Sequence, residues 1–197
     1  RLPHGGRLPG ATGGLAFSLK LVFNSTPVIK LITVFSRPAG EERDILFLFV
    51  LVALVVALDQ LSKYLVATYM EAGESIAVIK DFFHLTYVRN PGAAFGMLPY
   101  RTVLLVVITL LVIGLIIYYY RTLPPGFWLM KAGLALQLGG AIGNMIDRVR
   151  SSYVIDFLDF KIWPPVFNLA DSAIVVGIII FLLSFWRMAP LLEGGNS

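Results

Sequence analysis

Four long apolar stretches constrain the fold of this 197-residue chain more than any other feature. A helix needs ~20 mostly apolar residues to cross the hydrocarbon core of a bilayer. Charged residues make up 14% of the chain, whereas soluble domains contain about 25%. We therefore predict an integral membrane protein with an all-α membrane fold of four transmembrane helices. They are expected at about Ile45–Val66, Thr102–Tyr120, Phe127–Ile146 and Leu169–Trp186.

The first 43 residues differ from the rest of the chain. Their longest apolar run, Leu15–Phe35, is interrupted by two lysines, an asparagine and a proline, which makes it too broken for a transmembrane helix. Because the sequence starts at Arg1 rather than Met, we expect an extension of unclear role: an interfacial segment, a tag remnant or a misassigned start. The predicted organisation is this extension (1–43), a four-helix membrane domain (44–188) and a C-terminal tail (189–197).

The longest connection, residues 67–101, contains two runs of strand-forming residues. These runs are Ile76–Ile79 and Phe82–Val88, and they are rich in Val, Ile, Phe, Tyr and Thr. Asn90–Gly96 follows as a turn of small residues. We predict a small β-sheet that lies at the membrane surface.

Two aspartates lie where a membrane protein has few reasons to place an acid. Asp171 opens the fourth apolar stretch, and Asp156 lies across a short connection from it. An ionisable side chain close to hydrocarbon is costly, so it is a candidate functional residue. A pair of carboxyl groups that lie close together favours chemistry in which they share one proton.

Asp59 and Lys63 are four positions apart at the end of the first apolar stretch, so they share one face of a helix. Two interpretations stay open. They form a neutralising ion pair with Lys63 reaching outward to the interface, or they form the scaffold of a polar site.

The third apolar stretch carries a polar stripe with spacings of three and four. Its members are Gln137, Gly140, Asn144, Asp147 and Arg148. The last three are either a hydrogen-bonded cluster that ends the helix or part of a site. Gly139 and Gly143 form a pair of small residues that permits close helix packing.

Other kinds of catalytic site have no support in the sequence. There is no cysteine and there are only two histidines, and neither a zinc-binding His-Glu-x-x-His motif nor a Gly-x-Ser-x-Gly motif occurs. We expect no metal, no cofactor and no nucleic-acid partner. Asp159 is expected to be a solvated charge in a loop. Besides a carboxylate-pair hydrolase, the intramembrane acids are compatible with an ion-coupled transporter or a non-catalytic scaffold subunit.

Five ordered segments resemble bacterial lipoprotein signal peptidase, the signal peptidase II family of aspartic endopeptidases. The match covers about residues 44–188. The segments are Leu58–Lys63, Val88–Gly96, Gly139–Arg148, Val154–Phe157 and Phe167–Ser172.

The resemblance implies four transmembrane helices with a small extracytoplasmic β-rich cradle. It implies an endopeptidase that cleaves diacylglyceryl-modified prolipoproteins just before the lipidated cysteine. The family's catalytic aspartates fall on Asp156 and Asp171. Its supporting polar residues fall on Asp59, Lys63, Asn90, Asn144, Arg148 and Asn168, and we add Gly140 and Asp147 from the polar stripe.

The resemblance also sets the expected surroundings of the protein. It implies the bacterial cytoplasmic (inner) membrane, an active site on the extracytoplasmic side, and membrane lipids and prolipoproteins as partners. We expect a monomer. The distribution of Lys and Arg between the loops points weakly to the opposite orientation, so the expected orientation rests on the resemblance alone.

Overall fold

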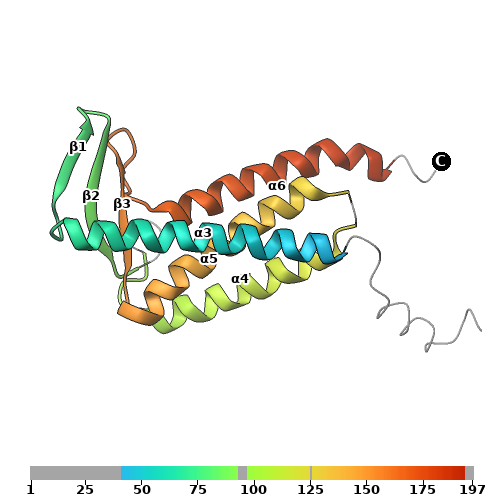
Figure 1. The fold of residues 1–197 in the computed structure, drawn as a ribbon, viewed down its shortest axis with the longest axis horizontal. Coiled ribbons are helices and arrows are strands. Elements are labelled where there is room, and N and C mark those ends of the chain that lie inside the picture. The colour runs from blue at the N-terminus through green and yellow to red at the C-terminus, as the bar shows by residue number, and fades with distance from the viewer. Residues whose placement is uncertain (1–40, 93–96, 125, 194–197) are drawn as a thin grey trace, which may run out of the picture. The chain divides into compact units, whose positions relative to one another are not determined.

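The computed structural model describes residues 41–92, 97–124 and 126–193. Each of the four apolar stretches is a helix in it (Figure 1). The helices are α3 (Glu41–Tyr69), α4 (Thr102–Thr122), α5 (Trp128–Ser151) and α6 (Leu169–Glu193). Most of them extend beyond the predicted apolar stretch, and α6 reaches into the predicted tail. Residues 1–40, nearly all of the predicted extension, lie outside the described residues.

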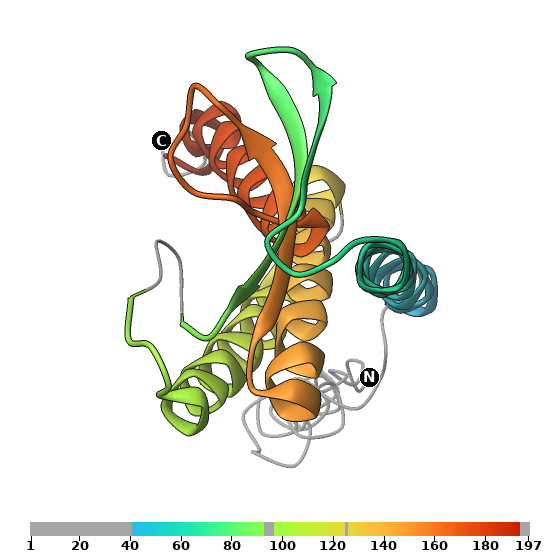
Figure 2. The same ribbon diagram turned by 90° about the vertical axis from the view of Figure 1, so that its left-hand side faces the viewer.

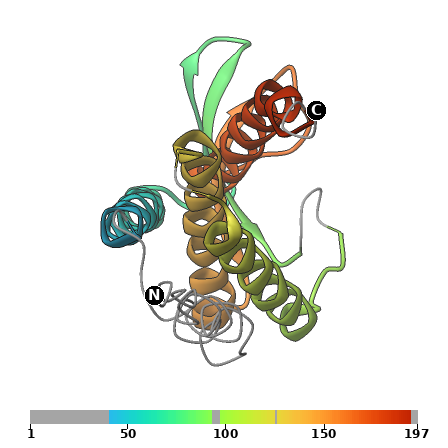
Figure 3. The ribbon, with the colours of Figure 1, turned by 90° about the vertical axis from the view of Figure 1, so that its right-hand side faces the viewer.

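The four helices differ in how much of their surface is apolar. α3, α4 and α6 are long and apolar enough to cross a membrane, over Glu42–Tyr69, Thr102–Thr122 and Leu169–Arg187. α5 carries the polar stripe and is the most buried of the four, with twelve buried residues against three in α4. Figures 2 and 3 show α5 in the middle of the other helices. This position shields it from lipid, which explains why it tolerates polar residues.

Glycines bring the neighbouring helices close to α5. A Cβ atom on Gly139 would lie 2.7 Å from Val55 Cβ of α3, and one on Gly143 would lie 2.5 Å from Asp59 Oδ2. Both distances are shorter than atoms tolerate, so only glycine fits at these positions. The small residues that the sequence singled out therefore serve helix packing within the chain.

A three-stranded antiparallel sheet lies at one end of the helices (Figure 1). Its strands are β1 (Ser75–Ile79), β2 (Phe83–Asn90) and β3 (Val154–Phe160), in the order β1-β2-β3. The first two match the predicted strands closely. β3 lies in the loop between the third and fourth apolar stretches, where no strand was predicted from the residues. It pairs with β2, so that Asp156 lies opposite Val88.

β3 also corrects the prediction for Asp159. Its side chain is not a solvated loop charge: the residue lies in the strand and is only 7% exposed. It accepts a hydrogen bond from Thr86 Oγ1 at 2.6 Å and forms an ion pair with Lys161. Thr86 of the neighbouring strand, which the local sequence does not reveal, and Lys161, two residues along the chain, hold it in place.

An apolar cluster fixes the sheet against the helices. Val66 of α3, Tyr87 of β2 and Phe157 of β3 form its buried centre, and Leu169 at the start of α6 packs against it. The C-terminal end of α3 and the N-terminal end of α6 are thereby held beside the strand that carries Asp156.

Candidate active site

Asp156 and Asp171 reach the same place from two different elements. Asp156 is on β3 and is 3% exposed. Asp171 is in the first turn of α6, three residues after Asn168. β3 and α6 are joined by the segment 161–168, which folds back so that the strand and the start of the helix meet.

Asn168 holds both carboxyl groups and is fully buried. Its Nδ2 donates a hydrogen bond to Asp156 Oδ1 at 2.6 Å. Its Oδ1 accepts one from the backbone N–H of Asp171 at 2.9 Å, and its own backbone N–H donates to Asp171 Oδ2 at 3.3 Å. The reciprocal pair is a capping box at the start of α6. One asparagine therefore both starts the helix and fixes the two acids relative to each other.

Two more asparagines donate to the remaining carboxyl oxygens. Asn90 Nδ2 lies 2.9 Å from Asp156 Oδ2, and Asn144 Nδ2 lies 2.7 Å from Asp171 Oδ1. Asn90 is at the end of β2 and Asn144 is on α5. Amide donors stabilise an ionised carboxyl group without adding a positive charge.

The surroundings raise the pKa of Asp156 to about 7. The largest cause is burial, which disfavours the charged form, and the negative charge of Asp171 adds to it. The hydrogen bonds from Asn90 and Asn168 act in the opposite direction. Near neutral pH the site can therefore hold a proton on one acid while the other is ionised.

Beneath the two acids lies a buried network of charges around Lys63, which is only 2% exposed. Lys63 Nζ lies 2.8 Å from Asp59 Oδ2, and it donates to Asn144 Oδ1 at 3.0 Å. It is also 2.7 Å from Asp147 Oδ2, an ion pair by distance that lacks the alignment of a hydrogen bond. The predicted Asp59–Lys63 ion pair therefore forms, but Lys63 is buried and does not reach outward to the interface. That the pair is the scaffold of a functional site stays a prediction.

This network acts on the helix that carries Asp171. Asp59 Oδ1 accepts a hydrogen bond from the backbone N–H of Ala170 at 3.0 Å. Asn144 Oδ1 is occupied by Lys63 and by Asn168 Nδ2, so its Nδ2 is left to face Asp171. The lysine thus fixes which end of the Asn144 amide points at the acid.

The other residues of the polar stripe have distinct places. Arg148 Nη2 donates to the carbonyl oxygen of Gly92 at 3.2 Å, which ties the end of β2 to α5. Gly140 packs directly on the backbone of Ala170, where a Cβ would collide with the carbonyl oxygen. Gln137 donates to the Gly133 carbonyl oxygen within its own helix and contacts none of the acids. Nine of the ten predicted site residues are therefore linked to one another by polar contacts. The tenth, Gly140, supports them by packing.

The sequence missed Gln60, whose amide donates to Asp59 at 3.1 Å and to Asp147 at 3.0 Å. It follows Asp59 directly, and only the folded arrangement places it between the two acids. Within the described part of the chain, no group of three or more His, Cys, Asp and Glu side chains is arranged to hold a metal ion.

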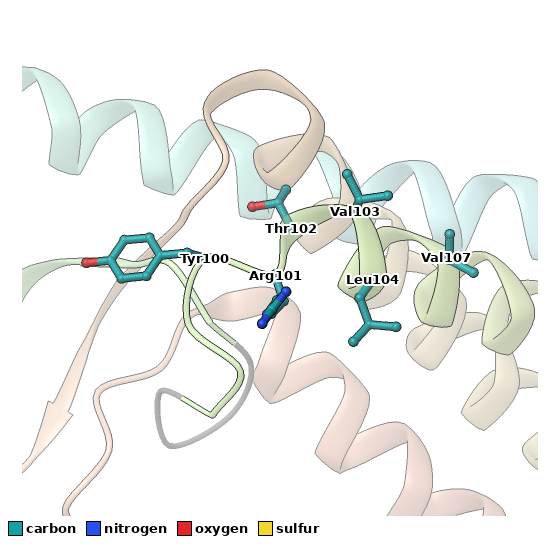
Figure 4. Close-up of a pocket in the computed structure, with 6 residues that line it drawn as sticks. All are labelled: Tyr100, Arg101, Thr102, Val103, Leu104 and Val107. Atoms are coloured by element: carbon teal, nitrogen blue, oxygen red, sulfur yellow. The ribbon is translucent and has the colours of Figure 1, made fainter.

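A hollow of about 570 Å³ lies at the start of α4 (Figure 4). Tyr100 and Arg101 precede the helix, and Thr102 is its first residue. Three exposed apolar side chains of its first turns complete the lining: Val103, Leu104 and Val107. The backbone N–H of Tyr100 donates to the carbonyl oxygen of Pro91 at 3.2 Å. This hydrogen bond places one wall of the hollow, Tyr100, beside the end of β2 and the residue that follows Asn90.

Comparison with known proteins gives a consistent result. The model of the family described as signal peptidase (SPase) II matches residues 51–187. The lipoprotein signal peptidase of Moorella thermoacetica is 59% identical over 149 residues, which are 75% of this chain and 97% of that protein. The lipoprotein signal peptidase of Halothermothrix orenii is 53% identical over 71% of this chain and 94% of that protein.

Solved structures agree with the fold. A bacterial membrane enzyme structure determined in meso at 2.3 Å resolution aligns with a TM-score of 0.68 and 33% identity, covering 73% of this chain and 89% of that one. A second, at 1.9 Å, aligns with a TM-score of 0.65 and 34% identity, covering 71% of this chain and 92% of that one.

Proposed function

The chain belongs to the signal peptidase II family, and we propose from this premise that Asp156 and Asp171 are its catalytic pair. The protein is a multi-pass membrane peptidase that removes the signal peptide from prolipoproteins. The observation that carries the proposal is the fully buried Asn168, which holds both carboxyl groups.

The two acids share one proton and divide the chemistry between them. Asp171 lies in the first turn of α6, where the helix dipole favours a negative charge, so it is the ionised member. Asp156, with a pKa of about 7, is the protonated member. Asp171 takes a proton from a water molecule, and the oxygen of that water attacks the scissile carbonyl carbon while Asp156 donates its proton to the carbonyl oxygen.

Cleavage follows when the tetrahedral intermediate collapses. The carbon–nitrogen bond breaks, the carbonyl is restored, and the nitrogen leaves as an amine after taking the proton that Asp171 gained from water. The hydroxyl proton returns to Asp156, so both acids end as they began. Asn90, Asn144 and Asn168 keep the acids in position throughout, because each donates to one of them.

The supporting residues act through these asparagines or through the start of α6. Lys63, Asp59 and Asp147 orient Asn144 and hold the backbone of Ala170. Arg148 holds the segment that follows Asn90. Gly140 lets α6 approach α5.

The substrate is a prolipoprotein whose cysteine already carries diacylglycerol, and the cut falls before that cysteine. The place of the site supports this: the acids lie where the apolar helices end and the sheet begins. The hollow at the start of α4 has the interfacial pattern of a tyrosine and an arginine beside apolar residues (Figure 4). The acyl chains lie along such apolar helix faces while the peptide reaches the acids.

The same proposal places the protein in its cell. It acts as a monomer in the bacterial inner membrane, surrounded by membrane lipids, with the acids on the extracytoplasmic side. The packing of the α5 glycines within the chain supports the monomer, because these small residues are already used.

A gel-shift cleavage assay tests the catalytic pair. Purified protein in detergent is mixed with a diacylglyceryl-modified prolipoprotein, in parallel with Asp156→Asn and Asp171→Asn. The control is Asp81→Asn, because Asp81 is exposed and its φ of 60° is one that asparagine also tolerates. We expect cleavage by the wild type and the control alone. Cleavage by folded Asp156→Asn would rule out the two-carboxylate mechanism.

A further inference from the structure

A second hollow, of about 410 Å³, opens directly beside Asp156. Asp156 and Asn90 form its polar side, and prolines and valines form most of the rest. Every residue that lines it comes from β2, from β3 or from the segments next to these strands, and none comes from a transmembrane helix. The lining residues are Val88, Arg89, Asn90, Pro91, Asp156, Pro164, Pro165 and Val166.

Arg89 is the cation of this hollow, and two tyrosines hold it in place. Its Nε donates a hydrogen bond to Tyr87 Oη at 3.0 Å. Its guanidinium carbon lies 5.4 Å from the ring centre of Tyr87 and 5.3 Å from that of Tyr153. An arginine stacked on aromatic rings loses little further freedom when it binds a ligand. Arg89 is thus positioned before any substrate arrives.

The positive charge of Arg89 has no acidic partner in the part of the chain that the structure describes. The ion pairs there are made by Lys63, Lys131 and Lys161. Arg89 is exposed, and its bond to Tyr87 uses Nε alone. A guanidinium offers five N–H donors, so its outer edge can take a carboxylate in a two-point contact.

The position of the hollow decides which part of a substrate reaches it. A prolipoprotein has an apolar signal peptide before the cut and a polar mature chain after it. The signal peptide must stay along the apolar helices, whereas the hollow lies wholly on the sheet side of Asp156. The segment that leaves the acids in this direction is therefore the start of the mature chain.

We propose that this hollow receives the residues that follow the lipidated cysteine, and that Arg89 selects acidic side chains among them. The inference rests on the proposed catalytic pair, because Asp156 marks where the cut occurs. Asp156 lines the same hollow, but its two oxygens already accept hydrogen bonds from Asn168 and Asn90. An acidic side chain therefore turns to Arg89.

Three matched substrates test this selection. They are diacylglyceryl-modified prolipoproteins that differ only in the two residues after the cysteine, which are both Asp, both Asn or both Lys. In low salt, we expect kcat/KM to fall in the order Asp, Asn, Lys, by about tenfold from first to last. Most of this difference should lie in KM, because Arg89 touches the substrate away from the reacting atoms.

Variants of Arg89 show whether it is the source of the order. Arg89→Gln should reduce the difference between the Asp and Lys substrates to about twofold, and Arg89→Glu should reverse it. Arg150→Gln is the matched control, because Arg150 is an exposed arginine at the end of α5 that does not line the hollow. It should keep the full difference.

The outcomes separate this proposal from the proposed function. An unchanged preference in Arg89→Gln, or no preference in the wild type, would overturn the role of Arg89 while the catalytic pair stands. No cleavage of any substrate by folded wild type would overturn the catalytic pair and this inference with it. If the Arg89 variants fail to fold, the wild-type preference decides by its salt dependence. It should shrink as salt rises, and a preference that salt leaves unchanged would contradict a charge contact.

Discussion

The two ends of β3 each bury an aspartate, yet they make these residues very different. At the outer end, Asp159 lies beside Lys161 and accepts a hydrogen bond from Thr86. At the end next to the helices, Asp156 accepts hydrogen bonds from two amide groups and lies close to a second acid, Asp171. The strand is the same, so the partners alone account for the difference.

The effect on the pKa values follows from these partners. Burial acts to raise the pKa of Asp159, but hydrogen bonds from Lys161 and Thr86 outweigh it, and the pKa is lowered. Burial and the charge of Asp171 raise that of Asp156 to about 7. A nearby cation thus makes an aspartate a permanent anion, whereas neutral amides and a like charge make it able to carry a proton.

The largest effect should come from removing one hydrogen-bond donor at each end of the strand. Asn168→Ala takes away the donor to Asp156 and the cap that orients Asp171, so we expect kcat to fall about 100-fold. Thr86→Val removes the donor to Asp159 and should leave kcat within about twofold. Steady-state cleavage kinetics measure both. Equal losses in the two variants would mean that the catalytic role is not confined to the inner end.

A smaller effect should appear in the pH dependence of cleavage. Because the pKa of Asp156 is about 7, kcat/KM should decline above this pH, by about tenfold per pH unit once the shared proton is lost. The carboxyl group of Asp159 is ionised throughout this range. Lys161→Gln, which removes its cation, should therefore leave the decline at the same pH. If kcat/KM of this variant declined at a different pH, the charge at the outer end would influence the protonation of Asp156.

The smallest effect concerns thermal stability, and it has opposite signs at the two ends. The raised pKa of Asp156 means that its contribution to stability is full at low pH and is lost as the pH rises to about 7. Asparagine cannot lose this proton, so the Tm of Asp156→Asn minus that of the wild type should increase between pH 4 and pH 8. Each kcal/mol of unfolding free energy that the wild type loses over this range should add about 2–4 °C to the difference.

For Asp159 the sign is reversed. Its lowered pKa stabilises the fold above the ordinary pKa of an aspartate, and this contribution disappears as the pH falls. Asp159→Asn should therefore lower Tm near pH 7 and have less effect near pH 3. Thermal unfolding in detergent at low and at near-neutral pH measures the Tm of each variant relative to the wild type. If this Tm difference changed with pH in the same direction for both variants, the contrast between the two ends would be contradicted.

The sequence allowed the helices and the first two strands to be predicted, because their signals are local. A run of about 20 apolar residues has few alternatives to a membrane helix, and alternating Val, Ile, Phe and Tyr favours a strand. β3 could not be found in this way. Its segment is short and contains two aspartates, and pairing with β2 is what makes it a strand.

The candidate site was found from motifs, and its geometry was not. Spacing placed Asp59 and Lys63 on one helix face, but whether Lys63 pointed outward or inward depended on Asn144 and Asp147 of another helix. The environment of Asp159 was wrongly predicted for a similar reason, because its hydrogen-bond donor Thr86 lies on β2 and reaches it only through the pairing of β2 with β3.

By itself, the sequence determined a four-helix membrane protein with two acids at the membrane boundary, because hydrophobic length and the cost of a buried charge are properties of short segments. Only the tertiary structure decided what surrounds each acid. Asn168 bridges Asp156 and Asp171, Thr86 of β2 donates to Asp159, and two tyrosines hold Arg89. A pKa and a binding preference depend on charges and donors within a few ångströms, and these come together only when distant parts of the chain fold against each other.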